Sequence, residues 1–381
     1  MNPALPSSAI PEEIAASTLN QRKRFDAAYA VLENGIRERA FPGAAFGVLS
    51  QGKILALDGV GQFTYDSNSP AVLPGTIYDL ASVTKVIATT SVAMLLYDRG
   101  LLDLDQPLAE TLPGFVIGVP SPRERSRVTV RMLLAHSSGL PAYARLFEAH
   151  PTPAALLAAC LQIPLEVPPG TRAEYSDIGF ILLGKAIEVI AKEPLDLFCL
   201  REVFTPLGMN ATRYQPPPLW RTFIPPTVDD IAFRGRVVEG EAHDENCSVL
   251  HGVSGHAGAF ANALDLLRYA SCILSRGKTF AGETLFRPET VELFATRQSQ
   301  PLGTSRALGW DTPSGESSSG HHFGPRSVGH LGYTGTSLWT DLDQEIAITL
   351  LTNRTWPDRT SQAIRKVRPA FHDAVFDAIA A

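Results

Sequence analysis

Residues 81–97 read Ala-Ser-Val-Thr-Lys-Val-Ile-Ala-Thr-Thr-Ser-Val-Ala-Met-Leu-Leu-Tyr. The apolar stretch 86–97 has the length of a helix, and Ser82 stands at its expected N-terminus. Because residues three apart share one face of a helix, the Lys85 amine is expected one turn from the Ser82 hydroxyl. A neutral lysine can take the proton of a serine and so activate it as a nucleophile. The reference pKa of lysine is about 10.4, so this role requires burial of Lys85 or a second cation nearby.

The same spacing occurs a second time, at Ser275 and Lys278. Gly277 interrupts the helical pattern there, and no matching motif surrounds the pair. For Ser82 and Lys85 the structural alternative is a helix-capping serine followed by a solvated lysine. The spacing by itself therefore does not assign a function, and its meaning depends on the rest of the chain.

A second stretch, 173–180, reads Ala-Glu-Tyr-Ser-Asp-Ile-Gly-Phe and leads into an apolar helical segment. Tyr175 could relay a proton beside the serine if nearby cations lower its pKa from about 10. Asp177 could hold Lys85 or a substrate amide. The alternative is a surface tyrosine followed by a helix-capping aspartate.

A third stretch, 328–336, reads Val-Gly-His-Leu-Gly-Tyr-Thr-Gly-Thr. Small residues at 332 and 335 would let a ligand lie along a strand edge and pair with its backbone. His330 would present a titratable ring to that groove. The alternative is a structural histidine whose hydrogen bonds are satisfied within the fold.

Length and composition exclude several classes of protein. The chain has 381 residues, which suggests two domains or one large one, and 45% of them are hydrophobic, enough for a sizeable core. A net charge of −6 without a basic block argues against nucleic acid as the main partner. No apolar run reaches the roughly 18 residues of a membrane span. Without a leader-like start, the sequence as it stands predicts a cytoplasmic protein, or a periplasmic one if a native leader was removed.

Both ends of the chain show helix and strand patterns, whereas the middle is rich in helical periodicity. The expected helices cover 11–39 and 361–379, and the expected hairpins pair 44–49 with 54–59 and 335–339 with 346–351. These patterns predict an α+β fold in which one antiparallel sheet, built from both termini, is flanked by helices. A mostly helical domain over 86–254 is inserted into a sheet domain made of 1–85 and 255–381.

Three motifs in this order resemble those of the penicillin-recognising serine hydrolases: Ser82-x-x-Lys85, Tyr175-x-Asp177 and His330-x-Gly332. That superfamily includes class C β-lactamases, D-alanyl-D-alanine carboxypeptidases and family VIII carboxylesterases. The stretches 100–107 and 130–141 are also similar to this group, and the resemblance runs from about residue 40 to 355. It implies a β-lactamase-like fold with the active site at the interface of the two domains.

The resemblance also implies roles for individual residues. Ser82 would attack a carbonyl, with Lys85 and Tyr175 sharing its proton. The backbone N–H groups of Ser82 and Tyr333 would form the oxyanion hole. No metal ion or organic cofactor is implied. Residues implied to bind and orient substrate are Asp177, His330 and Gly332.

A narrower likeness and two departures bear on the substrate. Residues 243–247 and 252–260 resemble the branch that contains the penicillin-binding protein 4B carboxypeptidases. His330 stands where many relatives have a lysine that binds the carboxylate of penicillins, and Asp177 stands where class C enzymes have an asparagine. Histidine is only partly cationic near neutral pH, and an aspartate lacks the amide donor that would bind a substrate carbonyl. Both departures point away from efficient β-lactam hydrolysis.

The expected function is that of a serine acyl hydrolase acting through an acyl-enzyme on small carboxylic esters or D-amino-acid-type amides. The alternative within the superfamily is a D-Ala-D-Ala carboxypeptidase or a β-lactamase. The alternative of another class is a catalytically inactive penicillin-binding-like module. An α/β-hydrolase is disfavoured because no G-x-S-x-G motif occurs. The expected partner is a small-molecule ester, amide or β-lactam, with no nucleic acid and no membrane, and nothing in the sequence indicates an oligomeric state.

Overall fold

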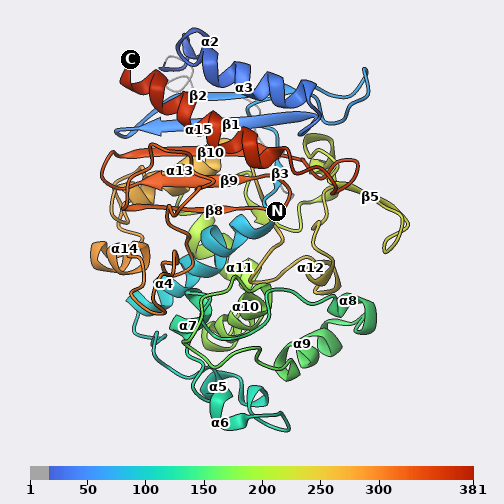
Figure 1. Ribbon diagram of the computed structural model, residues 1–381, viewed down its shortest axis with the longest axis vertical. Helices are drawn as coiled ribbons and strands as arrows, with labels where there is room; N and C mark the ends of the chain where they lie inside the picture. The colour runs from blue at the N-terminus through green and yellow to red at the C-terminus, as the bar shows by residue number, and fades with distance from the viewer. Residues whose placement is uncertain (1–16) are drawn as a thin grey trace.

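The computed structural model describes residues 17–381 and contains a five-stranded antiparallel sheet built from both ends of the chain (Figure 1). The predicted α+β fold is therefore confirmed. Both expected hairpins form, but the strand at 335–339 begins only at Ser337, because Gly335 has a φ of +101° and turns the chain just before it. In spatial order the strands are β2 (Lys53–Gly61), β1 (Gly43–Ser50), β10 (Ile346–Thr352), β9 (Ser337–Asp341) and β8 (Ser327–Leu331).

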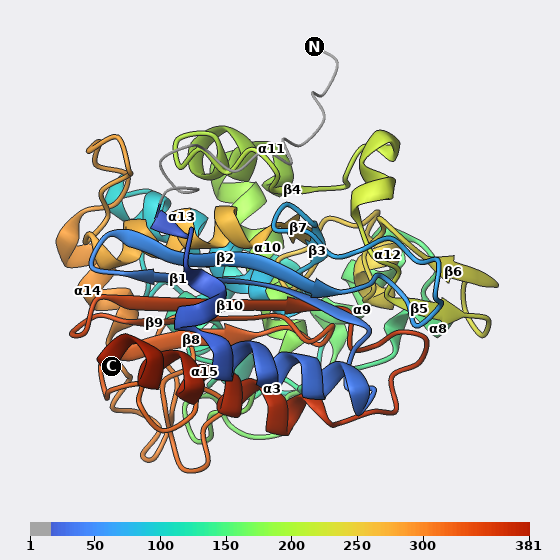
Figure 2. The ribbon, with the colours of Figure 1, turned by 90° about the horizontal axis from the view of Figure 1, so that it is seen from above.

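Two terminal helices lie side by side across one face of this sheet, α3 (Asp26–Arg37) and α15 (Ile364–Ala380) (Figures 1 and 2). Phe46 of β1 packs edge-on against Tyr29 of α3 and Phe371 of α15. The helix expected over 11–39 is shorter and interrupted: the chain leaves helical geometry at the buried Phe25, which separates α2 (Gln21–Arg24) from α3. Its first part, before residue 17, lies outside the described residues.

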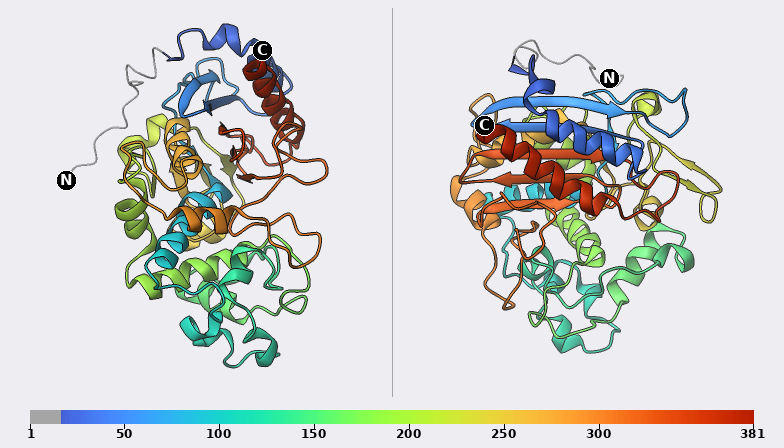
Figure 3. Two further views of the ribbon diagram at one scale, coloured as in Figure 1. Left: turned by 90° about the vertical axis from the view of Figure 1, so that its left-hand side faces the viewer. Right: turned by 45° about the horizontal axis from the view of Figure 1, so that its top comes forward.

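The opposite face of the sheet is covered by α13 (Ala263–Leu274) and, beyond it, by the helix that begins near Ser82 (Figure 3). Gly47 lets α13 approach β1, since a Cβ there would lie 2.7 Å from Leu267 Cδ1. The second helix starts as a 3₁₀ turn, η1 (Ala81–Val83), widens to π geometry in η2 (Lys85–Thr90), and continues as α4 (Ser91–Asp98). It is buried on all sides over most of its length, which explains its nearly continuous apolar sequence.

Most of the remaining helices gather beyond the β8 edge of the sheet, around α10 (Asp177–Ala191) (Figure 1). The elements of this part are α5 (Leu108–Thr111), η3 (Pro113–Phe115), α6 (Pro122–Arg125), α7 (Val130–Leu134), α8 (Leu146–Ala149), α9 (Pro153–Gln162), α11 (Leu195–Cys199) and η4 (Leu200–Phe204). Arg125 of α6 connects η3 with the C-terminal end of α9. Its guanidinium donates hydrogen bonds to the carbonyls of Phe115, Leu161 and Ile163 at 2.6–2.7 Å.

One hydrophobic core connects the sheet with the helical part. It includes Leu49 of β1, Leu267 of α13, Val86 of η2 and Phe180 of α10. The proposed division at 85/86 and 254/255 stays a prediction, and apolar packing continues across it. The smaller elements are β3 (Tyr78–Asp79), β4 (Arg213–Tyr214), η5 (Pro218–Phe223), β5 (Val228–Asp230), β6 (Arg236–Val238), α12 (Glu245–Val249), β7 (Ala259–Ala261) and α14 (Pro288–Ala295). None of the helices within 17–381 is long and apolar enough to cross a membrane.

Candidate active site

Ser82 is half-buried at the start of η1, on a turn that the third motif holds in place. Ala81 has a φ of +45°, and Asp79 stabilises this unusual conformation by accepting the Ala81 N–H at 2.7 Å. The hydroxyl of Thr334 donates to the Asp79 carbonyl at 2.7 Å, and that of Thr336 donates to the Leu80 carbonyl at 2.9 Å. The segment after β8 is thus tied directly to the residues that precede the serine.

Lys85 is fully buried one helical turn beyond Ser82, as the spacing predicts. Its Nζ lies 3.0 Å from Ser82 Oγ, 2.6 Å from Asp177 Oδ1 and 3.0 Å from the carbonyl oxygen of His256. When the amine is neutral, it can donate two N–H groups to Asp177 and His256 while its lone pair faces the serine hydroxyl. The arrangement is the one that a general base for Ser82 needs.

Tyr175 comes from the loop before α10, and its hydroxyl donates to Ser82 Oγ at 2.6 Å. The next residue, Ser176, caps α10 by accepting the Gly179 N–H at 3.0 Å, and its own N–H donates to Nδ1 of the buried His136 at 3.0 Å. The His136 ring packs on the Tyr175 ring with centroids 4.7 Å apart. A helix cap and a stacked histidine therefore fix the phenol against the serine.

Burial changes the acid–base properties of both groups beside Ser82. It lowers the pKa of the Lys85 amine, and the charges of Asp177 and Asp244 oppose that shift. Burial, together with the Asp177 charge, raises the pKa of the Tyr175 phenol well above its usual 10. The Arg306 charge opposes this rise but does not overcome it, so the condition of a lowered pKa is not met. The resting phenol is neutral and acts as a hydrogen-bond donor.

His330 is buried on β8 with its ring 5.8 Å from that of Tyr175, and its Nδ1 lies 2.8 Å from the Leu331 carbonyl. Burial lowers its pKa to about 3, helped by the charges of Lys85 and Arg306. The imidazole is neutral at physiological pH, so it cannot replace the cationic lysine of many relatives.

The neighbouring glycine and tyrosine shape the turn after β8. A Cβ on Gly332 would lie 2.0 Å from Thr336 Oγ1 and 2.3 Å from the Leu80 carbonyl oxygen, so this position needs a glycine for contact with the Ser82 turn. The role of Gly332 in substrate binding stays a prediction. The Tyr333 side chain is half exposed, and within 17–381 its backbone N–H has no hydrogen-bond partner. That free N–H is compatible with the oxyanion role expected of Tyr333 and Ser82.

Two residues of the site were not singled out as functional by the sequence. Arg306, on the loop between α14 and β8, lies with its Cζ 5.6 Å from the centre of the Tyr175 ring, although 131 residues separate the two in the chain. His136 belongs to a stretch that the family resemblance includes, yet only its contact with Ser176 and Tyr175 reveals what it supports.

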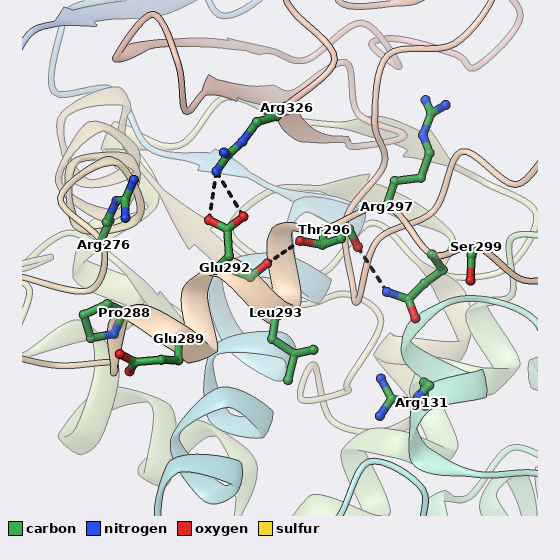
Figure 4. A pocket seen from close by; sticks show the side chains of 11 residues that line it. Arg131, Arg276, Pro288, Glu289, Glu292, Leu293, Thr296, Arg297, Ser299 and Arg326 are labelled. Carbon is green, nitrogen blue, oxygen red and sulfur yellow. Dashed lines mark hydrogen bonds and ion pairs between the residues drawn. The ribbon is translucent and has the colours of Figure 1, made fainter.

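The second Ser-x-x-Lys pair has no comparable surroundings. Ser275 follows α13, and Gly277 turns the chain with a φ of +92° before Lys278. A cavity of about 860 Å³ lies nearby, between α14 and α7, and contains the ion pair of Glu292 with Arg326 at 2.8 Å (Figure 4). None of the residues proposed to act on substrate lines it.

Comparisons with known proteins agree with this geometry. The family model described as Beta-lactamase matches residues 26–369. The chain belongs to the beta-lactamase family. It is 31% identical over 351 residues to an N-acetylmuramyl-L-alanine amidase of Bacillus subtilis (strain 168), covering 82% of this chain and 77% of the relative. It is also 31% identical over 312 residues to an Escherichia coli (strain K12) protein named provisionally as a D-alanyl-D-alanine carboxypeptidase, covering 74% and 69%.

Among solved structures, EstCE1, described as a hydrolase with promiscuous acyltransferase activity, superposes with a TM-score of 0.74 at 20% identity, covering 93% of this chain and all of the other. This identity shows a shared fold only. The family membership makes the chain a β-lactamase-family serine hydrolase. The narrower likeness to the penicillin-binding protein 4B branch stays a prediction.

Proposed function

We propose that this β-lactamase-family protein is an acyl hydrolase that cleaves small carboxylic esters or D-amino-acid-type amides through an acyl-enzyme on Ser82. The observation that carries the proposal is the contact of one hydroxyl with two proton-handling groups: Lys85 Nζ at 3.0 Å and the Tyr175 hydroxyl at 2.6 Å. A binding module without catalytic function has no need for this convergence.

In the acylation step, Ser82 Oγ attacks the substrate carbonyl while its proton moves to the Lys85 amine. The negative charge on the carbonyl oxygen would be stabilised by the N–H groups of Ser82 and Tyr333. The Tyr175 phenol then donates its proton to the leaving oxygen or nitrogen and regains one from Lys85. Deacylation repeats the sequence with water as the nucleophile, so that the proton balance closes over one turnover.

An arginine beside Tyr175 supports substrates that carry a carboxylate. The guanidinium of Arg306 is near Tyr175 and approaches Asp311 at 3.6 Å, beyond hydrogen-bond distance. Within 17–381 its side chain donates no hydrogen bond and only pairs loosely with Asp311, so the guanidinium has donors left for a bidentate contact with an anion. This feature favours the second candidate, a D,D-carboxypeptidase, over an esterase for purely neutral esters. The relatives named as an amidase and as a carboxypeptidase also favour an amide or peptide substrate.

The proposal is tested by comparing Ser82→Ala with the matched control Ser275→Ala, each assayed with a short p-nitrophenyl ester. We expect Ser82→Ala to abolish hydrolysis, whereas Ser275→Ala retains the wild-type rate. Mass spectrometry after incubation with a penicillin then separates the substrate classes. A stable adduct on Ser82 indicates penicillin recognition, rapid turnover a β-lactamase, and no adduct alongside ester cleavage an esterase. Equal rates for wild type and Ser82→Ala would refute the mechanism.

A further inference from the structure

The buried Ser254 and His256 and the partly exposed Asp244 form a hydrogen-bonded chain of side chains next to Lys85. Ser254 Oγ lies 2.8 Å from His256 Nδ1, and His256 Nε2 lies 2.8 Å from Asp244 Oδ1. The order resembles that of a serine hydrolase triad. However, Ser254 is 5% exposed and His256 1% exposed, so no substrate carbonyl can reach this serine. The chain therefore needs a function other than nucleophilic attack.

The backbone of the same segment contacts the catalytic amine. The carbonyl of His256 accepts a hydrogen bond from Lys85 Nζ at 3.0 Å, and the preceding carbonyl, of Gly255, accepts one from Thr89 Oγ1 at 2.6 Å. Gly255 also packs directly on α10, because a Cβ there would lie 2.1 Å from the Phe180 carbonyl oxygen. The segment thus lies packed between η2 and α10. The His256 carbonyl occupies one of the three hydrogen-bonding positions around the Lys85 amine.

Anchoring both ring nitrogens of His256 fixes this residue and with it the peptide that follows His256, whose carbonyl contacts Lys85. One anchor, Asp244, is itself held at the start of α12, where its Oδ1 accepts the Cys247 N–H at 2.7 Å. Burial would raise the pKa of Asp244, but His256 and the Cys247 N–H bring it down to about 2, so Asp244 is ionised. The charged groups that face the Lys85 amine from the elements around it are Asp177, Asp244 and Arg306.

We propose that Ser254, His256 and Asp244 are positioning residues for Lys85, which hold the His256 carbonyl against the amine so that its lone pair is directed at Ser82. The inference rests on the proposed function, in which Lys85 is the base. These three side chains, arranged like a catalytic triad, thereby orient Lys85, the proton acceptor for Ser82. Because Asp244 carries a negative charge near the amine, it also favours the ammonium form of Lys85.

The test measures how fast Ser82 is phosphonylated by a fluorophosphonate probe as a function of pH, a readout that does not depend on the natural substrate. Asp244→Asn keeps the side-chain size and removes the charge. We expect a rate loss of about 10-fold on the plateau, and a shift of the acidic limb to lower pH because the Lys85 amine loses a neighbouring anion. Ser254→Ala leaves the charge in place, so it should reduce the plateau rate by a few-fold without moving the limb.

Asp265→Asn is the matched control. Asp265 is a buried carboxylate in the first turn of α13 that accepts the Ala211 N–H at 2.8 Å, and it is not among the charged groups that face Lys85. This variant should be less stable in a urea titration. The plateau rate of Ser82 labelling and the pH of its acidic limb should stay as in the wild type. If Asp244→Asn and Ser254→Ala both behave like Asp265→Asn, the positioning role is refuted. Labelling that persists in Ser82→Ala would instead refute the proposed function, so the two failures are distinguishable.

Discussion

Replacing Arg306 by glutamine should change which esters the protein prefers. The Arg306 side chain is 20% exposed, lies beside Tyr175, and forms an ion pair with Asp311 at 3.6 Å. If its free N–H groups bind a substrate carboxylate, the variant loses a charge-assisted contact. Such contacts contribute about 1.5–3 kcal/mol, and the partial exposure and shared Asp311 charge favour the lower end. At roughly 1.4 kcal/mol per factor of ten, the expected loss is about 10- to 30-fold.

The assay compares kcat/KM for two acetyl esters that differ only in the leaving group, 3-hydroxybenzoate or the uncharged 3-hydroxybenzamide. The Arg306 charge also lowers the pKa of Lys85, so its removal alters the base itself. That effect applies to both esters and cancels in the ratio. Arg306→Gln should reduce the benzoate-to-benzamide ratio by the predicted factor, and Arg306→Lys should retain part of the preference. A ratio that stays the same in Arg306→Gln would refute the assignment of a carboxylate site to this arginine.

Three further outcomes are expected. Tyr175→Phe removes the 2.6 Å contact to Ser82 and should lower kcat by about 10²–10⁴-fold with little change in thermal stability, as measured by parallel kinetics and calorimetry. Arg125→Met leaves three carbonyls without their buried donor and should reduce the free energy of unfolding by about 3 kcal/mol in urea; a loss below 1 kcal/mol would contradict this reasoning. Acid should destabilise the fold, because burial depresses the pKa of four histidines. Below about pH 6.5 the unfolded chain therefore binds protons at these histidines, whereas the folded chain does not. Asp79 and Asp265, whose pKa values burial raises to about 6, bind protons in the folded state and offset two of those four. The net two protons correspond to a loss of about 2–3 kcal/mol per pH unit near pH 5, measured by urea titrations at several pH values, and stability that rises on acidification would exclude it. The four histidines are His136, His243, His330 and His372.

Local patterns predicted the sheet well because each hairpin carries its own information. The strands β1 and β2 are separated only by a short turn through Gln51 and Gly52, both with positive φ, so alternation and turn residues suffice to pair them. The boundaries were less predictable where packing overrides periodicity. Phe25 interrupts the first helix because its ring is buried where the chain changes direction, and no local pattern encodes that.

The candidate site divides in the same way. The approach of Lys85 to Ser82 follows from one helical turn, and the convergence of Tyr175 was accessible through the family resemblance. The electrostatics were not, because the pKa of Tyr175 is raised chiefly by burial, and the extent of burial is known only from the folded structure. Arg306 was not predicted as a site residue for a related reason. An arginine in a loop belongs to no spaced motif, and only the fold places it next to Tyr175.

The position of β1 inside the sheet, between β2 and β10, has consequences for how the protein is made. β1 pairs on one side with its neighbour β2, but on the other with β10, where Ala44 faces Thr352. During synthesis on the ribosome, β1 therefore waits with an open hydrogen-bonding edge until nearly the whole polypeptide has emerged. Nascent chains arrested before β10 would expose that edge to other molecules. Expression at low temperature or with holdase chaperones should therefore raise the soluble yield. The reason is that these conditions protect the open edge of β1 during synthesis, and not that they change the finished fold.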